Sequence, residues 1–384
     1  MARLLPALTA TNAAEERARL VREVAAGRVP RPRWTLRRRR VDRSLWGAVE
    51  EARVQVRGLP LADHYLDRLE ELETELAMID ALGRPKLVRP LAARRFGTGR
   101  VTVRTPDGPV ELSRIARGLL ASLPHREEPR DVPAVSDRPG APSLARAIRA
   151  FADAADLDLE IRVEPRLSAG AATGDRTVFL ADRRFGRREC TRFAVHEVLG
   201  HAVAAANARV QPLRLFAIGT AGGFRAQEGL CLYLEEAAGV LDAYRLRVIA
   251  ARVLATDRMH HGASFGETAR WLARDEGFRA DDAVSICERA YRGGGGARDV
   301  GYLRGWLEVR AALAQGWTTV DDLRSGRIGL PVARALGAMR EAGLARPPRY
   351  RPSLARSLAS TRSGTSPEMS PPSVNASLTM LEET

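Results

Sequence analysis

The sequence predicts an α+β fold that is mostly helical, with a small antiparallel sheet placed ahead of two long helices. Apolar residues recur at helical spacing over residues 1–123 and again over 191–345. Between these regions, residues 157–165 alternate apolar and polar side chains as a half-buried strand does, and 176–182 is expected to be a second strand. The proline- and charge-rich segment 124–143 interrupts the chain as a linker or a long surface loop would.

The first region is expected to hold two helices and a hairpin. Residues 44–56 and 64–83 both carry apolar residues at helical spacing, and Gly83 is a plausible stop for the second helix. Residues 100–112, RVTVRTPDGPVEL, alternate on both sides of a Pro-Asp-Gly turn, which is typical of a hairpin.

These patterns predict four parts along the chain. Residues 1–123 form a mostly helical N-terminal region, and 124–143 form the linker or loop. Residues 144–352 form the main domain, in which almost everything after residue 191 is helical. The last part, 353–384, is rich in Ser, Thr and Pro and is expected to be disordered.

The chain of 384 residues carries a net charge of +14, and almost all of its basic residues are arginines. Lys86 is the only lysine, which indicates a compositional bias of the whole chain and weakens the charge as a sign of a nucleic-acid partner. The densest basic run, RPRWTLRRRRVDR at 31–43, would suit phosphate binding but carries no nucleic-acid-binding module. A solvated or acid-paired basic segment is the favoured interpretation.

Two further features bear on the location of the protein and on its redox chemistry. No apolar run is long enough to span a membrane, and the apolar stretch at the start is too short for a secretion signal, so a cytoplasmic protein is expected. Cys190, Cys231 and Cys287 show no paired spacing. They are expected to be small buried residues and not a disulfide framework or a thiolate zinc site.

The segment FAVHEVLGHAVAAANA, residues 193–208, contains two histidines five residues apart, His196 and His201. Residues four apart on a helix lie about 40° from each other and can share a metal, whereas residues five apart lie about 140° from each other. A π-bulge would bring the two histidine side chains to the same face of the helix, and Gly200 reduces crowding there. The motif alone leaves two alternatives open, a metal site on a distorted helix or a buried helix with two core histidines.

A metal site needs a third protein ligand, and Glu228 is the strongest candidate, at the start of a predicted second helix. Glu235 lies on the same face and would orient a ligand histidine through its second ring nitrogen. The alternative for Glu235 and Glu236 is a solvated charged pair. In the metal-site interpretation Glu197 is the general base that takes a proton from a zinc-bound water.

Four motifs in order resemble one family: VHEVLGHAVAAAN, QPLRLFAIGTAGGFRAQEGLCLYLEE, GASFGETARWL and AYRGGGGARDVGYLRGWLEV. The chain is similar over residues 145–350 to the bacterial QEGLA-motif proteins, a tyrosine/phenylalanine carboxypeptidase domain related to the microtubule-associated tyrosine carboxypeptidases. The family itself has the longer histidine spacing. The resemblance implies a zincin-like metallopeptidase whose sheet packs against the metal-binding helices.

The resemblance also implies the site and the reaction. His196, His201 and Glu228 would hold Zn²⁺, with Glu197 as the base, and a C-terminal Tyr or Phe would be removed from a peptide or protein. Cys231 departs from the family pattern, which usually has alanine there, and no loss of ligation is expected. The Ala- and Arg-rich composition is typical of a bacterial chain, for which tubulin is not the expected substrate.

Substrate binding is expected to use an arginine and a sheet edge. An arginine pairs best with a terminal carboxylate, and Arg292 is the chosen candidate, with Arg304 as another. Tyr302, or else Tyr291, would donate a hydrogen bond to the oxyanion. Residues 168–182 would supply a strand edge for the peptide, unless they form a plain loop before the strand. The rival function is a non-catalytic regulatory or interaction protein that keeps the metallopeptidase fold.

Overall fold

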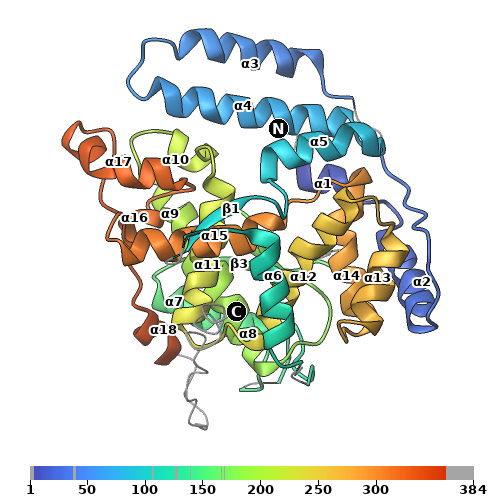
Figure 1. The fold of residues 1–384 in the computed structure, drawn as a ribbon. Helices are drawn as coiled ribbons and strands as arrows, with labels where there is room; N and C mark the ends of the chain where they lie inside the picture. The colour runs from blue at the N-terminus through green and yellow to red at the C-terminus, as the bar shows by residue number, and fades with distance from the viewer. Residues whose placement is uncertain are drawn as a thin grey trace. The chain divides into compact units, whose positions relative to one another are not determined.

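The computed structural model describes residues 4–37, 40–105, 108–125, 129–138, 140–165, 167 and 169–359. These residues are mostly helical, with two small sheets, as the sequence predicts (Figure 1). They divide into two compact units. Unit 1 holds the described residues of 4–125 and 243–304, and unit 2 holds those of 129–242 and 305–359.

Unit 1 contains a two-stranded hairpin among helices. Its helices are α1 (Leu4–Leu8), α2 (Ala13–Ala25), α3 (Arg43–Gln55), α4 (Ala62–Asp80), α5 (Pro85–Phe96), α6 (Leu112–Ser122), α12 (Ala243–His260), α13 (Phe265–Arg274), α14 (Ala280–Tyr291), the short 3₁₀ helix η2 (Arg292–Gly294) and the first residues of α15 (Val300–Ala314). Strands β1 (Thr102–Thr105) and β2 (Gly108–Glu111) pair antiparallel, so the predicted hairpin is confirmed, although Pro106 and Asp107 lie outside the described residues.

The two helices predicted near the N-terminus are confirmed as α3 and α4, which lie side by side (Figure 1). Leu76 and Ile79 of α4 are buried in a cluster with Val49 of α3 and Leu8 of α1. Gly83 follows the end of α4 with φ of +76°, a left-handed conformation that glycine adopts without strain, which explains the stop there. The apolar stripe of α4 is therefore the core side of this part of unit 1.

Unit 2 holds a three-stranded sheet and the helices around it. Its elements are α7 (Leu144–Ala154), β3 (Glu160–Val163), β4 (Ala171–Thr173), β5 (Thr177–Leu180), α8 (Arg187–Phe193), the π-helix η1 (Ala194–Ala202), α9 (Val203–Arg209), α10 (Leu215–Ile218), α11 (Gly223–Ala237), the rest of α15, α16 (Val320–Leu323), α17 (Leu330–Glu341) and α18 (Leu354–Ala359). Helix η1 continues α8 and runs on into α9 without a break.

The sheet of unit 2 is mixed, and the expectation of an antiparallel sheet is wrong for one of its two strand pairs. The strand order is β3-β5-β4, with β4 antiparallel to β5 but β3 parallel to β5. Val178 and Leu180 of β5 are fully buried, so the most apolar strand takes the centre of the sheet. Strand β5 thereby lies between β3 and β4, and β4 is left at an edge.

The first predicted strand is shorter than the alternation of residues 157–165 indicates. Leu157 and Leu159 are buried as expected, but the strand begins only at Glu160. The carbonyl of Leu159 accepts a hydrogen bond from Arg149 Nη1 of α7 at 2.7 Å. That carbonyl is therefore bonded to a side chain where a strand residue would bond to its neighbouring strand.

Two segments outside the regular core also have defined structure. Val132, in the segment expected to be a linker or loop, is buried and forms an isolated antiparallel bridge with Phe185 of unit 2. Residues 354–359, in the tail expected to be disordered, form α18, and Ser357 is fully buried. Residues 360–384 lie outside the described part of the chain. Among the helices that are described, none is long and apolar enough to cross a membrane.

Within unit 2, α11 and the second part of α15 approach each other through two glycines. A Cβ atom added at Gly229 would lie 2.2 Å from the carbonyl oxygen of Gly305, and one added at Gly305 would lie 2.2 Å from that of Arg225. Both contacts are with backbone, which cannot rotate away as a side chain can. The close crossing is therefore possible only with glycine at both positions, and it fixes α11 in unit 2.

We expect Gly229→Ala to lower the free energy of unfolding of unit 2 by about 1–3 kcal/mol, because the helices must separate to admit the methyl group. The matched control is Gly337→Ala in α17, where a Cβ would meet nothing within 4 Å. That change should stabilise the chain by about 0.5–1 kcal/mol, since alanine is a better helix former than glycine. Urea denaturation followed by circular dichroism measures both, and equal effects of the two substitutions would contradict the close crossing.

Candidate metal centre

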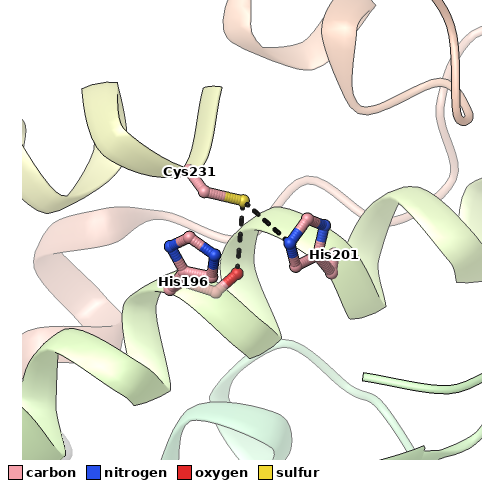
Figure 2. Close-up of side chains that lie close together, drawn as sticks. All are labelled: His196, His201 and Cys231. Carbon is pink, nitrogen blue, oxygen red and sulfur yellow. Dashed lines mark hydrogen bonds between the residues drawn. The ribbon is translucent and has the colours of Figure 1, made fainter. Parts of the chain in front are cut away.

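The two histidines of the motif lie on a π-helix, as the sequence requires for a shared metal. Residues Ala194–Ala202 form η1, and the N–H of Val203 reaches the carbonyl of Val198, five residues earlier. In a π-helix hydrogen bonds join residues five apart, so side chains at this spacing come to the same face. The rings of His196 and His201 accordingly lie with centroids 5.0 Å apart and planes at 75° (Figure 2). The predicted helix distortion is confirmed.

Arg324, in the segment that follows α16, stabilises the π-helix from outside. Its Nε donates a hydrogen bond to the carbonyl oxygen of Leu199 at 2.9 Å, and the side chain is buried. Burial lowers the pKa of this guanidinium to about 10, which still leaves it charged at neutral pH. A charged donor to a carbonyl of the distorted segment stabilises the irregular backbone. No local pattern in the sequence marks this residue for that role.

The carboxylate of Glu228, on α11, lies beside both imidazoles. Glu228 Oε2 is 3.4 Å from Nε2 of His196 and 3.8 Å from Nε2 of His201. A tetrahedral zinc ion with ligand bonds of 2.0–2.2 Å holds its ligand atoms about 3.3–3.5 Å from one another. The distance from Glu228 to His196 lies in this range, and the distance from Glu228 to His201 is slightly longer. The structure brings together the three ligands predicted from the sequence.

Glu235, two turns further along the same face of α11, makes the contact predicted for it. Its Oε1 lies 2.7 Å from Nδ1 of His196, and its side chain is 0% exposed. A carboxylate on Nδ1 fixes the ring orientation and leaves Nε2 to face Glu228. The alternative of a solvated charged pair is wrong for Glu235. Glu236 also has a protein partner, because it accepts a hydrogen bond from Trp306 Nε1 at 2.8 Å.

The carboxylates around His196 favour the charged form of its ring. Burial opposes charge on His196, but the nearby Glu228 carboxylate and the hydrogen-bonded Glu235 outweigh it and raise its pKa to about 9. Burial likewise disfavours the Glu228 carboxylate, yet the nearby rings of His196 and His201 bring its pKa well below the ordinary value. The buried carboxylates therefore select positive charge at this point.

A sulfur atom also lies in the site. Cys231 Sγ is 3.6 Å from Nε2 of His201 and 3.5 Å from the backbone oxygen of His196 (Figure 2). The ligand atoms of His196, His201 and Cys231 all lie within 4.8 Å of one another, so these three residues form a group that can hold a metal ion. All three cysteines are buried, as the sequence predicts, and none of them forms a disulfide bond.

The place of Cys231 beside the histidines was not expected from the sequence. The overlooked signal is its position three residues after Glu228, which puts both side chains on one face of α11.

Glu197, the predicted base, is held by a residue from the sheet. Thr173, the last residue of the edge strand β4, donates from Oγ1 to Glu197 Oε2 at 2.8 Å and also lies 3.1 Å from the Glu197 backbone oxygen. Glu197 is buried, so this hydroxyl is a strong constraint on where the carboxylate points. Sequence reasoning missed Thr173, because nothing local links β4 to a helix that begins about twenty residues later.

Arg292 and Tyr302, predicted to bind substrate, belong to unit 1, whereas the residues of the metal site belong to unit 2. Nη2 of Arg292 lies 3.8 Å from Oδ1 of the buried Asp299. Tyr302 is buried, and the guanidinium carbon of Arg252 lies 5.5 Å from the centre of its ring. The roles of Arg292 and Tyr302 at the substrate stay predictions.

We expect the apparent zinc affinity of the chain to rise with pH until about pH 9. The folded chain keeps a proton on His196 up to that pH, whereas the unfolded chain loses it at the ordinary value of 6.5, so the proton stabilises the fold fully below pH 6.5 and that stability is lost as the pH rises towards 9. Metal binding must displace it, so affinity should increase by up to about tenfold per pH unit until the pKa near 9 is passed. Calorimetry in buffers of different ionisation enthalpy measures the released proton, and an affinity independent of pH would contradict this assignment.

The whole chain was compared with known proteins. A sequence model of the family described as microtubule-associated tyrosine carboxypeptidase matches residues 35–366. No match was found among curated proteins or among solved structures. The family match covers most of the 384 residues and includes all the side chains of the metal site. The chain therefore belongs to the microtubule-associated tyrosine carboxypeptidase family.

Proposed function

We propose that this protein is a zinc-dependent metallocarboxypeptidase that removes a C-terminal residue, Tyr or Phe, from a peptide or protein. Membership of the family implies an enzyme of the carboxypeptidase type. The observation that carries the metal-dependent part is the position of Glu228 Oε2, which lies 3.4 Å from Nε2 of His196 and 3.8 Å from Nε2 of His201. The specificity for an aromatic residue rests on the resemblance to the family.

His196, His201 and Glu228 would hold the ion in this proposal. A zinc ion bound by them would act as a Lewis acid towards the substrate carbonyl and lower the pKa of a water molecule to about 7. Glu235 keeps the ring of His196 oriented through Nδ1, so that Nε2 stays available. The side chain of His201 is 24% exposed, against 8% for His196, so His201 is the more exposed of the two histidines.

Glu197 is the general base in this mechanism. It takes a proton from the attacking water and passes it to the nitrogen of the leaving residue as the peptide bond breaks. The hydroxyl of Thr173 holds Oε2 of Glu197, which limits the carboxylate to one orientation before substrate arrives. A buried, pre-oriented base costs little reorganisation at the moment of proton transfer.

The edge strand β4 suits the role of a docking strand for the peptide. Its three residues, Ala171–Thr173, pair with β5 on one side only, and Thr173 connects the strand directly to Glu197. An added strand from the substrate would gain backbone hydrogen bonds along such an edge. Ser168, part of the stretch predicted to form this edge, lies outside the described residues.

Glu197→Gln tests the base. The amide keeps the size of the side chain and can still bond to Thr173, but it cannot accept a proton, so kcat should fall by about 10²–10⁴-fold. Zinc content, measured by elemental analysis, should not change. Activity is followed on peptides that differ only in the last residue, with loss of Tyr or Phe detected by mass spectrometry. Wild-type activity in Glu197→Gln would remove it as the base, whereas an inactive wild type with zinc bound would favour the non-catalytic alternative.

Glu228→Ala tests the third ligand. Removing the carboxylate should weaken zinc binding by at least about 100-fold, because the loss of even an indirect partner of a metal ligand costs 10–100-fold. The control is Glu236→Ala, which removes a carboxylate from the same helix where it bonds to Trp306 and not to the histidines. Zinc content after dialysis against a chelator compares the two variants. Equal zinc retention in Glu228→Ala and wild type would exclude Glu228 as a ligand.

A further inference from the structure

We propose that the sulfur of Cys231 is a fourth protein ligand of the metal, so that four side chains can close the site against water. This inference rests on the metal-binding part of the proposed function. It assigns a role to a residue that the family pattern does not require. The four ligands would be His196, His201, Glu228 and Cys231.

The distance between Cys231 Sγ and His201 suits two ligands of one ion. A tetrahedral ion with a zinc–sulfur bond of 2.3 Å and a zinc–nitrogen bond of 2.0–2.1 Å holds the two ligand atoms about 3.6 Å apart. Cys231 Sγ and Nε2 of His201 lie 3.6 Å apart. The distance between the sulfur and the His201 nitrogen is therefore the distance expected between two ligands of one ion. The distance between Glu228 Oε2 and the His196 nitrogen, 3.4 Å, is similar.

The backbone at Gly200 leaves space for the sulfur of Cys231. Cys231 and Glu228 lie three residues apart on α11 and therefore share a face of that helix. A Cβ atom at Gly200, next to His201, would lie 2.3 Å from Cys231 Sγ. The sulfur can therefore occupy this place only because position 200 has no side chain. Helices α11 and η1 meet here with a glycine on one and a cysteine on the other.

Polar atoms lie beside the thiol of Cys231. A cysteine that served only to fill space would be packed among carbon atoms. Here the sulfur faces a ring nitrogen of His201 and the backbone oxygen of His196, to which the thiol donates a weak hydrogen bond at 3.5 Å. On metal binding the S–H bond breaks, the proton passes to solvent and a sulfur–metal bond forms. Thiolate and the Glu228 carboxylate together would then neutralise the two positive charges of the buried ion.

Closure by four side chains has a chemical consequence. Structural zinc sites have four protein ligands, whereas catalytic sites keep one position for water. Hydrolysis at this site would therefore require Cys231 to leave the metal, and any modification that occupies the sulfur would hold the site in its three-ligand form. Sulfur ligation also shifts metal preference towards thiophilic ions such as Cd²⁺.

Cobalt substitution tests the proposal without relying on activity. The full chain is freed of metal and titrated with Co²⁺, and its absorption spectrum is recorded. Ligand-field bands in the visible region report that cobalt is bound in the site, and a sulfur-to-cobalt charge-transfer band in the near ultraviolet reports a thiolate ligand. We expect both in the wild type. Cys231→Ala should lose the charge-transfer band and keep the ligand-field bands, and Cys190→Ala, which removes another buried thiol of unit 2, should keep both.

The outcomes separate the two proposals. Visible bands without a charge-transfer band in the wild type, or a charge-transfer band that survives in Cys231→Ala, would overturn the sulfur ligand and leave the zinc enzyme standing. Failure of the wild type to bind cobalt or zinc would overturn both. If Cys231→Ala does not fold, as judged by circular dichroism, Cys231→Ser replaces it, because serine keeps the size of the side chain and gives no thiolate band.

Discussion

The site depends on one backbone feature, the π-helix that carries the motif. Two histidines five residues apart cannot face one ion from a regular helix, and η1 brings them to the same face at the cost of an irregular hydrogen-bond pattern. Arg324 offsets that cost with a charged donor to the carbonyl of Leu199, and Gly200 leaves room on the inner face. The histidine spacing, the buried arginine and the glycine are parts of a single arrangement.

Negative charges surround the ring of His196 on the π-helix. Glu228 and Glu235 lie one on each nitrogen of His196, and Glu197 acts on the same ring through its charge. Buried carboxylates are costly unless they are paired, and in the metal-free chain a proton on His196 supplies part of that pairing. A divalent ion would supply more. Burial and then the charge of Glu228 raise the pKa of the Cys231 thiol.

The small sheet contributes through its edge. Because β5 is the most buried strand, it takes the centre, and the short β4 is left at the border with Thr173 beside Glu197. On α11, the glycine contact between Gly229 and Gly305 holds the helix that carries Glu228. The sheet edge and the helix crossing thus place side chains from β4, η1 and α11 around one point, although these elements are separated in the chain.

The sequence by itself determined the helical character, the β1–β2 hairpin and the need for a distorted helix, because each depends on periodicity or spacing within a short segment. It also indicated Glu228 and Glu235, which follow from helical spacing and the need for a third ligand. Only the tertiary structure decided the parallel pairing of β3 with β5 and the partners Thr173 and Arg324, since these come from segments distant in sequence. Residues far apart in the chain come into contact through packing, and no local sequence pattern predicts which side chains these contacts will join.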